Sequence, residues 1–201
     1  MHLLVETNFL VELILGQEQA AACEKIVAAA EQEKLVLHVP SFSLMEQLYR
    51  LTAVSIERDQ LQGRVEKELK AAERETTDNS SLVQLKREFA TVFAERSVIQ
   101  QERMFATVSR ISRTARIIPL LGTTWALASE LNSTMSLTLP DAVVSASLLL
   151  QLEDLPAEEE KLFVSRDHKA FRQEGVKQLF KEKNCGVLLN FDDTVQKLRL
   201  V

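Results

Sequence analysis

The sequence predicts an α/β fold, with a Rossmann-like parallel β-sheet of about five strands flanked by helices and carrying a long inserted helical hairpin. The first observation is that five short apolar runs, each followed by a helical pattern, occur at residues 3–5, 35–39, 117–121, 162–164 and 187–191. Strands that alternate with helices form parallel sheets covered on both faces. The second observation is a long, charged stretch between the second and third runs that shows helical periodicity alone.

That central stretch predicts the hairpin. Apolar residues recur at helical spacing from residue 41 to about 75 and again from 82 to 111, and the polar segment TTDNSS at 76–81 lies between them. Helices of about 35 residues would each be roughly 50 Å long, and their interleaved charges suit exposed faces. We therefore expect an antiparallel hairpin at about 55–116. Because the chain on both sides completes the sheet, we expect a single domain over 1–201 with the hairpin as its extension.

Composition limits the classes of protein. The 201 residues are 46% hydrophobic and 26% charged, which is typical of a globular domain and not of a disordered chain. No apolar run approaches the roughly 18–20 residues that span a bilayer, and the amino-terminal segment lacks the basic leader of a signal peptide. Cys23 and Cys185 match no metal or redox spacing, so we expect reduced core thiols and a cytoplasmic protein.

Four acidic residues stand out by position. Glu6 ends the first strand, Glu46 lies in the helix after the second, Asp141 opens a buried helix after Pro140, and Asp167 follows the fourth strand. Taken singly, Glu46 is equally explained as a solvated helix residue, Asp141 as a helix N-cap and Asp167 as a turn residue. Glu6 is harder to explain, because a buried carboxylate must be solvated, paired or bound to a cation.

Four short motifs surround these acids in order along the chain. They are Glu6-Thr7-Asn8, with Thr7 or Asn8 expected as the helix N-cap; Pro40-Ser41 followed by Glu46; Asp141-Ala142 with Ala146; and the run SRDHKAF at 165–171. Their order and context resemble the PIN-domain family of metal-dependent ribonucleases over residues 1–54 and 117–191. The family has Asp-Thr-Asn in the first motif and Thr-x-Asp-x-Asp-Phe in the last. Glu6 and Lys169 therefore stand where the family has aspartates.

The resemblance implies hydrolysis of RNA phosphodiester bonds with Mg²⁺ or Mn²⁺. It implies catalytic roles for the acidic cluster Glu6, Glu46, Asp141 and Asp167, of which Glu6, Asp141 and Asp167 are the metal ligands. Asn8 and Ser165 are expected to hold the carboxylates in place. The net charge of −5 gives no global sign of nucleic-acid binding, but metal ions in an acidic site overcome this locally. A toxin-type member of the family would also have a small antitoxin as partner.

Candidate substrate contacts are basic. Arg110, Arg113 and Arg116 follow one another at i, i+3 and i+6, with Arg103 upstream, and Lys169 lies beside Asp167. The alternative for the arginines is a solvated helix face paired with acids of the other hairpin arm. Trp125 and Tyr49 are expected in the core and not as platforms for stacking bases.

Two other functions stay open at this stage. One is a catalytically degenerate PIN-like scaffold that binds RNA or a protein through the hairpin, which the departures at Glu6 and Lys169 favour. The apolar stripes of the hairpin also suit a homodimer. The other is a nucleotide-binding Rossmann-like fold, which the absence of a glycine-rich loop after the first strand disfavours.

Overall fold

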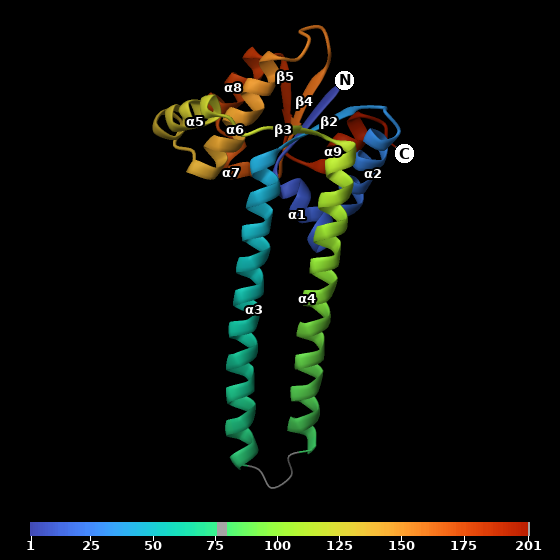
Figure 1. Ribbon diagram of the computed structural model, residues 1–201, viewed down its shortest axis with the longest axis vertical. Helices are drawn as coiled ribbons and strands as arrows, with labels where there is room; N and C mark the ends of the chain where they lie inside the picture. The colour runs from blue at the N-terminus through green and yellow to red at the C-terminus, as the bar shows by residue number, and fades with distance from the viewer. Residues whose placement is uncertain (76–79, 201) are drawn as a thin grey trace. The chain divides into compact units, whose positions relative to one another are not determined.

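The computed structural model describes residues 1–75 and 80–200 (Figure 1). The chain divides into two compact units, one formed by Met1–Gln47 with Ala106–Val201 and the other by Leu48–Phe105. The polar segment predicted as a turn lies mostly at 76–79, outside the described residues, and its last two serines already belong to a helix.

The first unit is built on a parallel sheet. Within the described residues it has five strands, in the order β3-β2-β1-β4-β5. They are β1 His2–Val5, β2 Val36–Pro40, β3 Arg116–Ile118, β4 Lys161–Val164 and β5 Cys185–Leu188. This confirms the predicted α/β fold with about five parallel strands.

Two strands end earlier than predicted. The third apolar run extends to residue 121, but β3 ends at Ile118 because Pro119 has no backbone N–H to donate to a neighbouring strand. The fifth run extends to residue 191, but β5 ends at Leu188. Asn190 leaves the sheet to cap the last helix, where its side chain accepts hydrogen bonds from the N–H groups of Asp192 and Asp193.

Helices cover both faces of the sheet (Figure 1). One layer contains α1 Thr7–Leu15, α2 Ala20–Glu31 and α9 Phe191–Lys197. The other contains α5 Gly122–Thr134, α6 Leu139–Glu153, α7 His168–Phe171 and α8 Glu174–Glu182. The α/β/α sandwich leaves the carboxyl ends of the strands, where β1 and β4 lead into helices, as the edge at which ligands collect.

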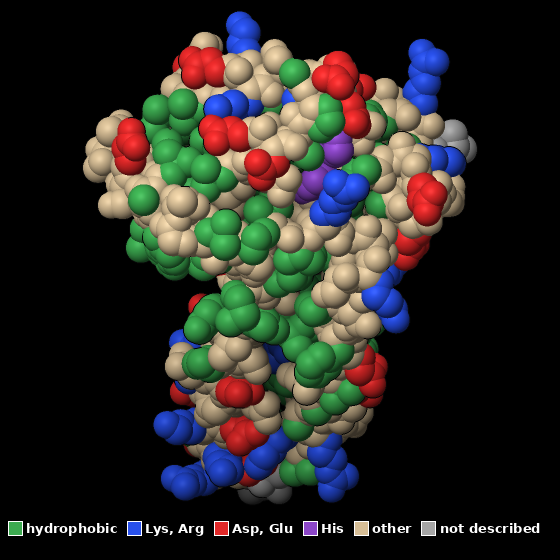
Figure 2. All heavy atoms as spheres, turned by 45° about the horizontal axis from the view of Figure 1, so that its top comes forward, with side chains coloured by type: hydrophobic (Ala, Val, Ile, Leu, Met, Phe, Trp, Pro, Cys, Tyr) green, Lys and Arg blue, Asp and Glu red, His purple; other side chains and the backbone are tan. Residues whose placement is uncertain are grey.

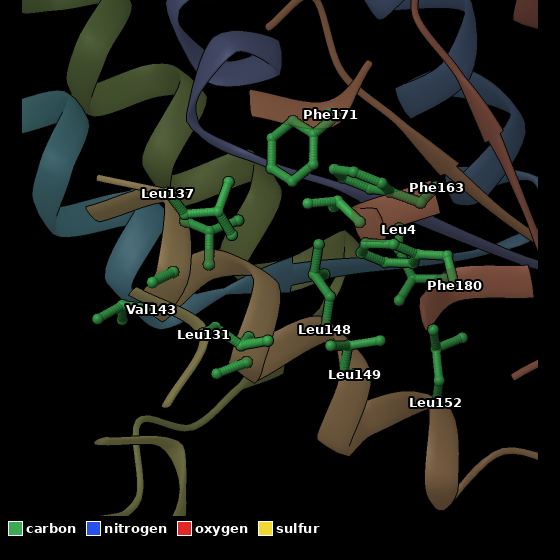
Figure 3. Packing of buried hydrophobic residues seen from close by; sticks show 14 of the residues in the cluster. Leu4, Leu131, Leu137, Val143, Leu148, Leu149, Leu152, Phe163, Phe171 and Phe180 are labelled. Carbon is green, nitrogen blue, oxygen red and sulfur yellow. The ribbon is translucent and has the colours of Figure 1, made fainter. Parts of the chain in front are cut away.

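The core on the α6 side is centred on Phe163 of β4 (Figure 3). Its ring lies 4.7 Å from the ring of Phe171, edge-on, and 4.8 Å from the stacked ring of Phe180. Helix α6 is buried over most of its circumference, as its apolar sequence predicts. Both cysteines are buried and free, in agreement with the expected core thiols, and burial raises the pKa of the Cys185 thiol to about 12.

The second unit consists of parts of two long helices, α3 Ser41–Glu75 and α4 Ser80–Thr114. Each has 35 residues, which confirms the predicted long helical insertion. The Arg58 guanidinium of α3 donates to Ser97 Oγ at 2.8 Å and to Gln100 Oε1 at 2.6 Å on α4, and these bonds link the two arms. Figure 2 shows hydrophobic side chains exposed among charged ones along these helices.

Within residues 1–75 and 80–200, no helix combines the length and the apolar character needed to cross a bilayer.

Candidate functional site

The candidate site lies where the strand order of the sheet reverses. From β1 the chain builds β2 and β3 on one side, and it later adds β4 and β5 on the other. Glu6 follows β1 and Asp167 follows the adjacent strand β4, so both acids emerge at this switch point. Crevices at such points are the usual ligand sites of open parallel sheets.

Glu6 is buried, with 4% of its surface exposed. It is the N-cap residue of α1, which corrects the expectation that Thr7 or Asn8 would cap this helix. The Glu6 Oε2 atom accepts a hydrogen bond of 2.8 Å from the Asn8 backbone N–H, and Oε1 accepts one of 2.8 Å from Ser165 Oγ. Hydrogen bonds to the ionised form are what make a buried carboxylate tolerable.

Ser165 joins the two strand ends. While it donates to Glu6, its Oγ accepts a hydrogen bond of 2.8 Å from the Asp167 backbone N–H. Asp167 in turn caps α7, since its Oδ1 accepts from the Ala170 N–H at 2.9 Å. The structure therefore brings Glu6, Asn8, Ser165 and Asp167 together in one hydrogen-bonded group.

Glu46 adjoins this group through Thr7. The buried Thr7 hydroxyl donates to Glu46 Oε2 at 2.5 Å, which places the carboxylate of α3 against the first turn of α1. Thr7 directly follows Glu6 in the chain. Glu46 of α3 is thus held against the residue that directly follows Glu6 at the end of β1.

Asp141 lies in the first turn of α6 but does not cap it. Thr138 is the N-cap, and its hydroxyl accepts from the Asp141 N–H at 3.4 Å while donating to Asp141 Oδ2 at 2.5 Å. The expected N-cap role was wrong because a threonine three residues earlier provides the acceptor. A carboxylate in the first turn still gains from the helix dipole.

The donor set is suited to a hard cation, because the carboxylates offer oxygen and no thiolate or imidazole stands among them. In the part of the chain that the structure describes, no three acidic, histidine or cysteine side chains converge as a ready-made metal cage. Mg²⁺ commonly binds through only one or two carboxylates, with water and phosphate oxygens as its other ligands. Glu6, Glu46 and Asp167 supply oxygen ligands of that type beside the ends of β1 and β4.

An ion pair beside the site was not found by sequence reasoning. Arg166, between Ser165 and Asp167, donates through one terminal nitrogen to Glu12 and through the other to Glu18 at 3.0 Å. Glu12 is only 1% exposed, and its second oxygen accepts from the Gln19 N–H at 2.8 Å. The signal was present in the sequence, since Glu12 interrupts the apolar stripe of α1 and so needs a buried partner.

The candidate arginines are placed differently from one another. Arg110 forms ion pairs with Glu24 at 2.5 Å and Glu31 at 2.7 Å, and these hydrogen bonds raise the pKa of its guanidinium. Its partners lie on α2 and not on the other hairpin arm. Arg113 is exposed near the end of α4, and Arg116 is the exposed first residue of edge strand β3. Lys169 is exposed on α7, next to Asp167.

Two aromatic residues are not in the core, contrary to the expectation. Trp125 is 47% exposed and Tyr49 is 71% exposed. Trp125 lies on the outer side of α5, whose buried positions include Ala128 and Leu131.

A buried histidine pair gave no signal in the sequence. His2 Nδ1 lies 2.9 Å from His38 Nε2, and His2 Nε2 lies 2.9 Å from Glu159 Oε2. Burial, followed by repulsion from His2, lowers the pKa of His38 to about 4, and burial also lowers the pKa of His2. His2 lies on β1 and His38 on the neighbouring parallel strand β2, and only the register of these two strands brings the imidazoles together.

Comparisons with known proteins give little further information. No protein-family model matches the chain, and no curated protein matches it in sequence. Among solved structures, the chain is similar to one in the crystal structure of VapBC2 from Rickettsia felis bound to a DNA fragment from their promoter. The TM-score is 0.45 at 13% identity, covering 94% of this chain and 98% of that chain.

Proposed function

We propose that this chain is a metal-dependent ribonuclease of the PIN type, which hydrolyses phosphodiester bonds of RNA. The observation that carries the proposal is the bridge formed by Ser165, which bonds to the Glu6 carboxylate and to the Asp167 backbone at the switch point of the sheet. A structural role alone gives little reason to bury an acid here, because a neutral side chain would cap α1 without the desolvation cost.

In this proposal Glu6, Asp141 and Asp167 would hold Mg²⁺ or Mn²⁺ directly or through water, and Glu46 completes the acidic cluster. Such an ion, when bound, makes water more acidic and stabilises charge on phosphate oxygens. The chain's other residues fix the carboxylates: Ser165 and the Asn8 N–H hold Glu6, and the Thr7 hydroxyl holds Glu46. Groups of this kind keep metal ligands in place.

Glu6 and Lys169, which stand where the family has aspartates, can each be explained physically. Glu6 is one methylene longer than aspartate, and its carboxylate uses that reach to meet Ser165 after β4. Lys169 is exposed two residues after Asp167, and its ammonium group suits a phosphate of the substrate. In this proposal the exposed Arg113 and Arg116 are further RNA contacts. Arg110 contributes less to RNA binding, because two glutamates of α2 occupy its guanidinium.

The test combines metal binding with cleavage. Mn²⁺ and Mg²⁺ are titrated by calorimetry into wild type, Asp141→Asn and the control Asp193→Asn, whose carboxylate is exposed on α9. Cleavage of a labelled single-stranded RNA is followed in the same samples. We expect binding and cleavage in wild type and the control, and loss of both in Asp141→Asn. A wild type that binds neither ion and leaves the RNA intact would overturn the proposal.

A second candidate function is a binding scaffold that acts through the hairpin. Leu85, Phe89, Val92 and Ile99 of α4 are exposed and share one helix face at spacings of i, i+4, i+7 and i+14. Such a stripe suits association with another helix, including that of a second copy. Self-association in sedimentation velocity that Phe89→Glu abolishes, with no metal-dependent cleavage by wild type, would favour this candidate.

A further inference from the structure

A cavity of about 280 Å³ adjoins the candidate site and has no role in the function proposed so far. It is lined by Asn8 and Glu12 of α1, Gln17 of the following turn, and Arg166. Asn8 bonds to Glu6 through its backbone, and Arg166 stands between Ser165 and Asp167. An open hollow lined by Gly16, Gln17, Glu18 and Arg166 lies around the same guanidinium. The cavity and the hollow therefore share Gln17 and Arg166, and Arg166 is adjacent in the chain to both Ser165 and Asp167.

The guanidinium of Arg166 is held by two very different acids. Glu12 is buried, and it keeps a second hydrogen bond from the Gln19 backbone. Glu18 is 83% exposed, and its bond of 3.0 Å to the other terminal nitrogen is a surface ion pair. A buried pair is costly to break, whereas an exposed pair is weak and screened by salt. One side of the arginine is thus fixed, and the other side is exchangeable.

We propose that Arg166 binds a phosphate of the RNA strand next to the one that is cleaved, and that this phosphate displaces Glu18. The inference rests on the proposed ribonuclease function and deepens it. The Arg166 side chain is 31% exposed, so it is accessible from the hollow while Glu12 keeps it in position. Glu18 accepts through one oxygen from one nitrogen of Arg166, whereas a phosphate can present two oxygens to the planar fork of the guanidinium.

The remaining contacts of the cavity fit the same ligand. Asn8 and Gln17 line it, and amide side chains are of the type that donates to phosphate oxygens. Arg110, by contrast, offers no comparable site, because Glu31 accepts from two of its nitrogens and Glu24 from the third. Arg166 combines a firm anchor with an exchangeable partner beside Asp167.

The test separates the effect of removing Glu18, which competes with the phosphate for Arg166, from the effect of removing one negative charge anywhere on the surface. Glu18→Gln removes the exposed partner of Arg166, and the matched control Glu158→Gln removes an exposed acid at the opposite end of β4. Binding of a fluorescent 12-nucleotide single-stranded RNA is measured by anisotropy in EDTA. We expect Glu18→Gln to tighten binding about two- to fivefold, the equivalent of one surface ion pair, and Glu158→Gln to leave it unchanged. Arg166→Lys keeps a charge beside Glu12 but lacks the fork, and we expect it to weaken binding.

The outcomes distinguish this inference from the function on which it rests. Equal Kd values for Glu18→Gln and Glu158→Gln, in a protein that binds and cleaves the RNA, would overturn the Arg166 site alone. Tighter binding by Glu18→Gln without any cleavage in Mn²⁺ would support the Arg166 site and overturn the nuclease. A wild type that neither binds the RNA in EDTA nor cleaves it in Mn²⁺ would overturn both.

Discussion

The Ser165 hydroxyl lies 2.8 Å from Glu6 Oε1 and donates a hydrogen bond to it, although the two residues are 159 positions apart in the chain. The same oxygen accepts from the Asp167 N–H. One small side chain therefore fixes the loop after β4 against the first turn after β1.

Ser165→Ala is expected to lower the cleavage rate by about tenfold to a hundredfold, because the carboxylate of Glu6 loses its orienting donor. Stability should fall by about 1–3 kcal/mol, since a buried carboxylate and a buried N–H each lose a partner. Single-turnover cleavage and urea unfolding measure the two effects.

Ser147→Ala is the matched control. Ser147 is also buried, but its hydroxyl donates to the Val143 carbonyl within α6. It should leave the cleavage rate of the folded protein unchanged. Equal rate losses in the two variants would show that Ser165 acts through general stability.

Thr7→Val is expected to reduce cleavage by about tenfold, because the isosteric valine cannot donate to Glu46 and the carboxylate gains freedom. Thr7→Ser retains the hydroxyl that makes the bond of 2.5 Å and should recover most of the rate. The measurement is the cleavage rate at saturating Mn²⁺. Equal rates for the valine and serine variants would argue that Glu46 needs no orientation by residue 7.

The fold class could be predicted from the sequence because the strands are short apolar runs separated by helices. The parallel sheet, the buried helix α6 and the two 35-residue helices all follow from period and composition. Strand ends were less predictable, since Pro119 and Asn190 terminate pairing inside runs that stay apolar. Trp125 was misplaced for a related reason: residue type alone does not tell which face of α5 is covered.

The site could be predicted only in part. The positions of the acids after the strands could be predicted from the sequence, but the hydrogen bonds that hold these acids join segments that are far apart in the chain. Gln19 shows this most clearly, because its N–H donates to Glu12 while its side chain accepts from the Phe191 N–H at 2.7 Å. This network joins α1, the residue before α2 and the start of α9. Its bonds depend on how these distant segments pack together, which local sequence patterns do not predict.

The His2–His38 pair predicts a stability that depends on pH. Burial lowers the pKa of His38 to about 4, below its ordinary value, so the folded state prefers the neutral imidazole. The unfolded chain then binds more protons between pH 6.5 and 4, and stability is complete above this window and falls as the pH drops through it. The loss attributable to His38 at the lower end is about 3 kcal/mol.

His38→Gln should flatten that dependence, because the variant has no imidazole to protonate on unfolding. His168→Gln, which alters an exposed histidine on α7, should keep the wild-type slope. Urea unfolding at half-unit steps from pH 7 to 4 gives both profiles. Parallel curves for the two variants would assign the acid sensitivity to carboxylates and not to this pair.

Phe163→Ala is expected to destabilise the protein by about 3–5 kcal/mol, since it removes a fully buried ring that contacts two others and leaves a cavity. Phe89→Ala on α4 is the matched change at a 39% exposed ring and should cost much less. Phe163 lies two residues before Ser165, so a cavity at Phe163 should also loosen the loop that holds Asp167. Thermal unfolding measures the first effect, and cleavage by the folded fraction at low temperature measures the second. A Phe163→Ala protein that is destabilised but cleaves at the full rate would show that the hydrogen bonds of Ser165 hold the site without support from the core.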